Sequence, residues 1–284
     1  MGLSSVIRLL FRLTHRFFGG HALDRFPTFK KLKERIIPFI KRDSVRVGED
    51  LLKLDKHDSL KLSIWGQYEP FVTAFALERI KPGMVVVDGG ANIGYYTVQF
   101  ARRVGEKGLV YAFEPAPENM LVLTENVEKN GHQNVRLCQY ALSDKVGDLK
   151  LYLSSINAGD HRISKDDERR ESVTIPGMAL DDLPNLKMPD FIKLDIQGAE
   201  AVALSGMKRV LFKRPLSLLM EFWPYGLVQC GSDPAQLLQN LLDAGFRISE
   251  LDGREKAVLP FDAERLLKDY TPENRLFTEL YCEK

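Results

Sequence analysis

Residues 88–94, Asp-Gly-Gly-Ala-Asn-Ile-Gly, have the composition of a ligand-binding turn. They follow the apolar run 84–87 and precede a helical pattern over 93–104, so they join a strand to a helix. Glycines let the backbone approach a ligand closely. The free N–H groups at a helix start favour a polar or anionic ligand. A turn of this kind can also be a tight connection that binds nothing.

A carboxylate after the next strand narrows the choice of ligand. A dinucleotide fingerprint needs glycine at its first, third and sixth positions, and neither Gly89 nor Gly90 starts such a register. Glu114 follows the predicted strand 109–113, where a carboxylate can accept hydrogen bonds from both ribose hydroxyls. The turn and the acid together favour a nucleoside ligand, with NAD and S-adenosylmethionine as the two candidates.

Acidic residues also follow the later strands. Asp195 and Glu221 stand near the ends of two predicted strands, 190–196 and 216–222. Buried carboxylates are costly without a partner, so this pair could bind a divalent cation, hold a cationic ligand or act as a base. Helix capping is the simpler alternative. Asp144 could accept from an adenine amine or belong to an ordinary turn.

The elements that must position these residues alternate along the chain. Apolar patterns predict strands over 84–87, 109–113, 135–141, 149–153, 190–196, 216–222, 246–251 and 276–282, short strands within 45–64, and helices over 68–80, 93–104, 118–129, 199–212 and 234–244. The polar segment 145–170 is expected to form a strand and then a mobile loop. Such alternation predicts an open, mostly parallel sheet. Its ligand should lie at the carboxyl ends of the strands, where the strand order switches.

Several motifs, in order and with matching spacing over about residues 65–250, resemble the FkbM family of methyltransferases. They are Tyr-Glu-Pro at 68–70, Lys-Pro-Gly at 81–83, the segment 87–97, Ala-Phe-Glu-Pro at 112–115, Ala-Leu-Ser-Asp at 141–144 and Phe-Ile-Lys-Leu-Asp-Ile-Gln-Gly-Ala-Glu at 191–200. Two positions depart from the usual pattern: Gly89 stands where the family often has valine, and Gln197 where it often has glutamate.

The resemblance implies a class I methyltransferase fold, a Rossmann-like α/β architecture. Its seven-stranded, mostly parallel sheet has helices on both faces and an antiparallel last strand. It also implies S-adenosyl-L-methionine as methyl donor and a hydroxyl acceptor on a sugar, glycan or polyketide-like small molecule. The donor-binding residues carried over by position are Glu69, Asp88, Gly89, Gly90, Asn92, Gly94, Glu114, Ser143 and Asp144. Of these, Glu114 would hold the ribose, Ser143 and Asp144 would lie near the adenine, and Glu69, with Asp195, near the sulfonium.

A neutral hydroxyl must lose its proton during methyl transfer, so a base or a metal must help. Asp195 is the first candidate base, because it should stand at the central crevice. His161, in the polar loop, is the second, since histidine titrates in the useful range; an exposed loop histidine without a role is the alternative. We predict no metal site, with an ion held by Asp195 and Glu221 as the weaker alternative. The polar loop and residues 223–225 are expected to shape the acceptor pocket.

The N-terminal segment differs from the rest of the chain. Residues 1–42 contain ten Lys and Arg against two acidic residues, a net charge of +8, whereas the remainder contains 30 against 37. We therefore predict a basic amphipathic helical arm over 1–42 and a methyltransferase domain over 43–284. The arm would either dock on the domain or contact an anionic membrane as a peripheral helix.

The overall composition sets limits on location and partners. The net charge of +1 gives no argument for a nucleic-acid partner, and the three cysteines match no metal or redox motif. We expect a cytoplasmic protein, with the inner face of the membrane as a second setting. Two rival functions remain at this stage. The failed glycine register disfavours an NAD-linked oxidoreductase, and the acids after three strands argue against a non-catalytic membrane-associated scaffold.

Overall fold

The computed structural model describes residues 41–284 except 155–156, 158, 165–169 and 214. Its strands are β1 (Ser44–Val47), β2 (Asp50–Lys53), β3 (Val85–Gly89), β4 (Leu109–Phe113), β5 (Val135–Cys138), β6 (Ala141–Leu142), β7 (Gly147–Tyr152), β8 (Ser172–Met178), β9 (Phe191–Leu194), β10 (Ser217–Phe222), β11 (Arg247–Asp252), β12 (Ala257–Pro260) and β13 (Thr278–Glu283). Its helices are α3 (Leu62–Trp65), α4 (Pro70–Arg79), α5 (Tyr95–Val104), α6 (Pro117–Lys129), α7 (Glu200–Ser205), α8 (Lys208–Leu211), α9 (Pro224–Gln229), α10 (Pro234–Asp243) and α11 (Ala263–Asp269), with a 3₁₀ turn at Leu180–Asp182. The predicted arm lies almost wholly outside the described residues.

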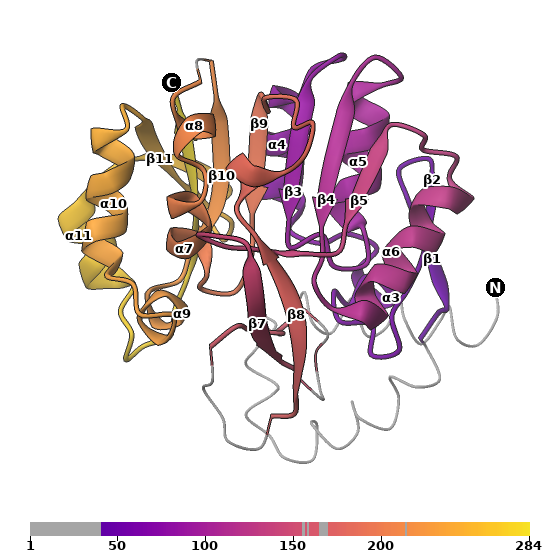
Figure 1. Cartoon of the computed structure of the whole chain (residues 1–284), viewed down its shortest axis with the longest axis horizontal. Helices are drawn as coiled ribbons and strands as arrows, with labels where there is room; N and C mark the ends of the chain where they lie inside the picture. Colours follow the sequence, from indigo (N-terminus) through magenta and orange to yellow (C-terminus); the bar gives the residue numbers. More distant parts are fainter. Residues whose placement is uncertain (1–40, 155–156, 158, 165–169, 214) are drawn as a thin grey trace.

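A large mixed sheet organises the described part of the chain (Figure 1). Its strand order is β12-β11-β13-β10-β9-β3-β4-β5. Strands β5, β4, β3, β9 and β10 run parallel, whereas β13 is antiparallel to both β10 and β11. The chain proceeds from β3 to β4 and β5 on one side and later returns to place β9 on the other. The order therefore switches between β3 and β9, and ligands bind at such a point in open α/β sheets.

The core lies on both faces of this sheet because neighbouring residues in the central strands point to opposite sides. Val87 and Ile192 pack with the helices α7 to α11, while Val86 and Phe191 pack with α4 and α5. All four side chains are buried. The continuous apolar runs of β3 and β9 are thus the pattern expected for strands covered on both faces.

This topology confirms the predicted class I methyltransferase fold, with seven core strands and the last, β13, antiparallel. Strand β12 adds an eighth member at the sheet edge, which the sequence pattern does not predict. No helix of the described residues is long and apolar enough to cross a membrane.

A second sheet, β6-β8-β7, extends beyond the carboxyl ends of the parallel strands, between α9 and α3 in Figure 1. The sequence predicts one strand over 135–141, but the chain forms two, β5 and β6, which belong to different sheets. Strand β8, which follows the expected loop within 145–170, is not predicted. It pairs with β7 along six residues, and this hairpin carries Asn157 and residues 159–163 to the large sheet's ligand-binding end.

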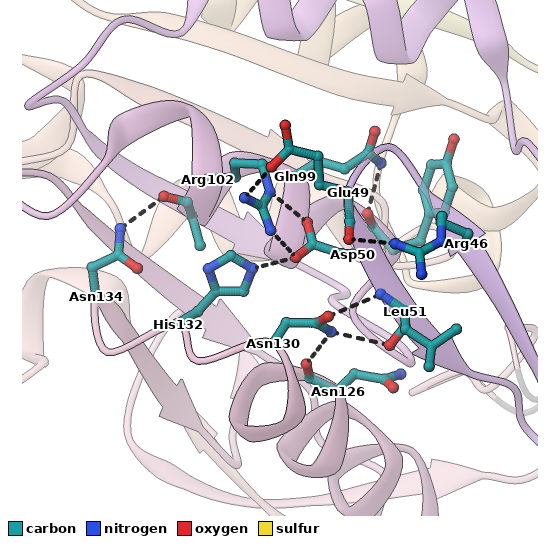
Figure 2. Close-up of polar contacts among 12 residues, drawn as sticks. Arg46, Glu49, Asp50, Leu51, Gln99, Arg102, Asn126, Asn130, His132 and Asn134 are labelled. Atoms are coloured by element: carbon teal, nitrogen blue, oxygen red, sulfur yellow. Dashed lines mark hydrogen bonds and ion pairs between the residues drawn. The ribbon is translucent and has the colours of Figure 1, made fainter.

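A polar clamp fastens the β1–β2 hairpin to the helices (Figure 2). The Asp50 carboxylate, 1% exposed, accepts from Arg102 Nε at 3.0 Å and Nη2 at 2.6 Å. It also lies 2.9 Å from His132 Nε2. Because the carboxylate is almost fully buried, these partners offset its desolvation. The clamp therefore holds the hairpin against α5 and the end of α6.

Two asparagine side chains of α6 pair with the backbone of β2. Asn130 exchanges hydrogen bonds with Leu51 N and O at 2.8 and 3.0 Å. Asn126 does the same with Lys53, at 2.6 and 2.9 Å, and its amide nitrogen also donates to the Ile93 carbonyl at 2.8 Å. The backbone edge of β2 is therefore satisfied by side chains rather than by a third strand.

Candidate functional site

A cavity of about 380 Å³ lies at the switch point between β3 and β9. Its walls come from the glycine turn (residues 88–94), the end of β4, Asn157 with residues 159–163, and the residues after β9 and β10. The parallel strands deliver these segments to one edge of the sheet because their carboxyl ends share it. The cavity therefore collects about half of the residues singled out in the sequence: Gly90, Asn92, Glu114, His161, Asp195 and Glu221.

Gly90 fixes the floor of the cavity. Its φ is +81°, and a Cβ at this position would lie 1.9 Å from the Asp195 carbonyl oxygen. The backbone of the turn after β3 and the backbone after β9 are thus in direct contact, and Asp195 N donates to Gly89 O at 3.0 Å. Only glycine satisfies both the positive φ and the close approach.

Glu114 closes the glycine turn from the neighbouring strand. Its Oε2 accepts from Asn92 N at 2.8 Å, and its Oε1 accepts from Ala116 N at 2.9 Å. The side chain is 5% exposed and lines the cavity. Burial raises the pKa of Glu114 to about 7, although these backbone hydrogen bonds act in the opposite direction. Oε1 also accepts a long hydrogen bond from Asn119 Nδ2 at 3.4 Å. Oε2 therefore keeps a free lone pair for a ligand, and Oε1 has one that only this long hydrogen bond occupies.

Asp195 is held by two neighbours at the end of β9. Its Oδ2 accepts from Lys193 Nζ at 3.1 Å, and its Oδ1 accepts from Gln197 Nε2 at 3.1 Å. Lys193 is 2% exposed, and its ammonium lies 4.4 Å from the centroid of the Tyr96 ring. Burial alone would lower the pKa of Lys193, but the Asp195 and Asp88 carboxylates raise it above its usual value. A buried cation therefore sets the orientation of the Asp195 carboxylate.

Further carboxyl groups surround this ion pair. Glu221 lines the cavity, and Glu279 is its direct partner in the register of β10 with β13. Burial, followed by the nearby acids, raises the pKa of both residues well above the usual value for glutamate. Glu69 accepts from Tyr96 Oη at 3.0 Å, and burial with the Asp195 carboxylate raises its pKa. Burial and mutual repulsion thus favour the neutral form of these groups in the free protein.

His161 lines the same cavity from the segment beside β7. Its Nδ1 accepts from Ser154 N at 3.0 Å, and burial lowers its pKa. The acceptor role of Nδ1 requires the proton of the neutral ring to be on Nε2. In this geometry His161 is therefore a hydrogen-bond donor toward a ligand.

A stack of rings and guanidinium groups borders the cavity beyond β10. The Arg162 guanidinium lies 4.6 Å from the Trp223 ring centroid, and the Arg275 guanidinium lies 4.3 Å from that of Tyr225. The two aromatic rings are 5.3 Å apart, and Trp223 Nε1 donates to the Arg275 carbonyl at 3.2 Å. Three separate segments therefore combine into one amphipathic wall.

The structure separates the other predicted residues from the cavity lining. Ser143 is buried, and its hydroxyl lies 3.1 Å from Asp144 Oδ1, but neither residue lines the cavity. Asp88 is fully buried beneath the turn and accepts from Thr97 Oγ1 at 2.6 Å. Gly89 and Gly94 shape the turn, with Gly94 capping α5. Glu69 lines a second cavity, of about 360 Å³, together with Glu279.

Sequence reasoning overlooked several residues of this site. Lys193 was noted only as part of a motif, although a lysine inside an apolar strand is itself a signal of a buried ion pair. Glu279 lay in a predicted strand, but nothing local showed that it would face Glu221. Arg275 and Phe277 line both cavities from the loop before β13, and no local pattern around these two residues indicates that position. Among the described residues, no group of three or more His, Cys, Asp or Glu side chains is arranged to hold a metal ion.

Comparison with known proteins gives consistent results. The methyltransferase FkbM domain matches residues 88–248, more than half of the chain. The hexuronic acid methyltransferase AglP of Haloferax volcanii is 33% identical over 144 residues, which cover 50% of this chain and 58% of that relative. Methyltransferase 1 of Beauveria bassiana is 28% identical over 144 residues, covering 43% and 57%. The chain thus spans less than two thirds of either relative.

Among solved structures, a methyltransferase FkbM from Methylobacillus flagellatus aligns with 78% of this chain and 52% of its own, at 16% identity and a TM-score of 0.45. The domain match covers the glycine turn, Glu114, Asp195 and Glu221, which border the cavity described above. The chain therefore belongs to the FkbM family of S-adenosylmethionine-dependent methyltransferases.

Proposed function

We propose that this protein transfers a methyl group from S-adenosylmethionine to a hydroxyl group of a sugar-containing acceptor. The observation that carries the proposal is the position of the Glu114 carboxylate, which closes the glycine turn at the rim of the switch-point cavity. The named activity of the Haloferax volcanii relative, methylation of a hexuronic acid, supports a sugar as the acceptor.

The residues present fit the donor. Glu114 has a free lone pair on Oε2, and displacement of the long Asn119 hydrogen bond would free one on Oε1, so the carboxylate could accept from both ribose hydroxyls. The Asn92 side-chain oxygen is buried without a hydrogen-bond partner among the described residues and lines the cavity, so it suits a donor group of the ligand. Leu142 and Ile163 supply an apolar wall for the adenine ring. We therefore assign the donor to the side of the cavity formed by the glycine turn.

The remaining side chains would position the acceptor. When bound, S-adenosylmethionine supplies an electrophilic methyl group on a positively charged sulfur. Positioning is then a large share of what the protein contributes. Asp195, fixed by Lys193 and Gln197, would orient the acceptor by accepting a hydrogen bond from a hydroxyl next to the reacting one. His161 would donate one to a neighbouring sugar oxygen. The wall of Trp223, Tyr225 and two arginines suits the apolar face and hydroxyl edge of a sugar ring.

Two measurements test the proposal. In a thermal-shift assay, S-adenosylhomocysteine should raise the melting temperature, whereas NAD should not. With S-adenosylmethionine carrying a tritiated methyl group, label should then pass to methyl glucuronide, and methyl glucoside serves as the neutral comparison. A protein that NAD stabilises and S-adenosylhomocysteine does not would overturn the assignment of the donor. Label that reaches neither sugar would overturn the assignment of the acceptor.

A further inference from the structure

Glu221 carries a buried carboxyl group that the fold leaves without a partner. The side chain is 6% exposed, and its Oε2 has no hydrogen-bond partner among the described residues. It nevertheless lines the switch-point cavity. Asp195, by contrast, has both oxygens engaged by neighbouring side chains. An unpaired buried carboxyl costs stability, so its presence beside a ligand cavity indicates a role toward the ligand.

The surroundings of Glu221 are strongly acidic. The charged and titratable groups that face it are Asp195 and Lys193 at the end of β9, Glu200 at the start of α7, Glu279 across the sheet on β13, Glu69 before α4, and Arg275 in the loop before β13. Lys193 is committed to Asp195, and the Arg275 guanidinium stacks on Tyr225. Carboxyl groups this close cannot all ionise, so some hold a proton.

We propose that Glu221 accepts the proton of the acceptor hydroxyl, and that it becomes an anion only when a cationic donor occupies the cavity. This inference rests on the proposed function. The sequence-based expectation names Asp195 and His161 as the candidate bases and leaves a basic role for the pair Asp195 and Glu221 open. The structure favours Glu221, because its Oε2 has no hydrogen-bond partner among the described residues, whereas Asp195 and His161 already accept hydrogen bonds from protein groups.

The positive charge of the donor explains why Glu221 ionises only when the donor is bound. S-adenosylmethionine has a net charge of +1, whereas S-adenosylhomocysteine is neutral. A positive charge enclosed with the acidic cluster favours the ionised form of Glu221, which lines the cavity whereas Glu279 does not, because Coulomb interactions are weakly screened there. In the free protein, burial holds the pKa of Glu221 well above its usual value. Donor binding should therefore displace its proton.

The transfer step balances. The O–H bond of the acceptor breaks and its proton goes to the Glu221 carboxylate. As the oxygen–methyl bond forms, the sulfur–methyl bond breaks and its electron pair stays on sulfur. The sulfur becomes neutral at the same time as Glu221 regains its proton. The site thus returns to the charge state of the free protein when the products form. The acidic cluster therefore suits the cationic donor while Glu221 is ionised, and the neutral products once Glu221 is protonated.

Calorimetry can count the displaced proton. Binding enthalpies are measured near pH 7 in two buffers of different ionisation enthalpy, once with S-adenosylmethionine and once with S-adenosylhomocysteine. We expect the charged donor to release about one proton more than the neutral product. Glu221→Gln should remove this excess while leaving the affinity for S-adenosylhomocysteine within about twofold of wild type. Glu283→Gln, further along β13 and 44% exposed, should keep the excess.

Infrared difference spectra test the same point without a variant. Adding S-adenosylmethionine should remove a band of a protonated carboxyl group, and S-adenosylhomocysteine should leave it. The inference is overturned if both ligands release equal numbers of protons, or if the excess persists in Glu221→Gln. The failure of both ligands to bind would instead refute the proposed donor site. Glu221→Gln should fold, because glutamine closely resembles the neutral carboxyl of the free protein.

Discussion

Replacement of Glu114 should weaken donor binding by a calculable amount. A hydrogen bond to a charged group contributes roughly 1.5–3 kcal/mol. Loss of both ribose hydroxyl contacts in Glu114→Ala, at the lower figure, costs about 3 kcal/mol, which corresponds to about a 150-fold rise in Kd. The variant also leaves Asn92 N and Ala116 N without their acceptor. We therefore expect a loss of at least 100-fold.

The pH dependence gives a second, independent signature. The anion is the form that accepts both hydroxyls, and the pKa of Glu114 in the free protein is about 7. Donor affinity should fall as the pH is lowered through 7, by about tenfold per unit once the carboxyl is mostly protonated. Glu114→Ala should lose this dependence. S-adenosylhomocysteine is the ligand for this titration because it carries no charge that would act on Glu221.

Isothermal titration calorimetry between pH 6 and 8 measures both effects. Glu118→Ala is the matched control, since Glu118 is exposed in the first turn of α6 and does not line the cavity. It should bind as wild type does. Wild-type affinity in Glu114→Ala would refute the ribose assignment. An unchanged pH dependence in that variant would show that another group is responsible for the titration.

Three further predictions follow from the site and the fold. Asp195→Asn should lower turnover by about 100-fold or more while donor affinity changes little, as a radiolabelled methyl-transfer assay and calorimetry would show; normal turnover would remove Asp195 from the mechanism. Glu114 and Glu200 have pKa values raised to about 7 by burial. Their stabilising contribution is therefore complete below about pH 4.5 and is lost as the pH rises through 7, so the melting temperature of the free protein should fall by ~5 °C between pH 5.5 and 8; a rise would contradict the buried neutral acids. Asp50→Asn should reduce the free energy of unfolding in urea by about 2 kcal/mol, whereas Glu49→Gln, an exposed partner of the same arginine, should change it by less than about 0.5 kcal/mol; equal effects would disprove the clamp.

Local patterns were sufficient for the central part of the fold. The apolar strands β3, β4 and β9 and the helices α5 and α6 appear within a few residues of their predicted bounds. Burial against the sheet determines which of their positions are apolar, and this pattern can be read within a short window of sequence. The positions of the glycine turn and Glu114 could be predicted in the same way, because each comes directly after a strand whose end is marked by the end of an apolar run.

Long-range contacts explain where the predictions were wrong. The expected helix 199–212 is divided into α7 and α8, because the Asp181 carboxylate accepts from Arg209 N at 2.6 Å and Val210 N at 3.1 Å and so starts a second helix. Strand β8 is polar on one side and exists through its pairing with β7. Neither partner is visible within a local window of sequence.

The acidic cluster illustrates the same limit within the site. Glu69, Glu221 and Glu279 lie far apart in the sequence, and each alone is an ordinary glutamate. Their proximity depends on β13 entering the sheet antiparallel beside β10 and on the turn before α4. Sequence reasoning found Glu221 as a residue at a strand end, but the reason for its unusual chemistry is supplied by its neighbours across the sheet.

The side chain of Asn126 has a mechanical consequence. It bonds to the backbone of Lys53 and, through the same amide nitrogen, to the Ile93 carbonyl within the glycine turn. The β1–β2 hairpin that it grips is also the covalent continuation of residues 1–40. A shift of the hairpin relative to α6 would therefore reach the glycine turn across one amide group, so the position of the turn depends on how firmly the hairpin is held.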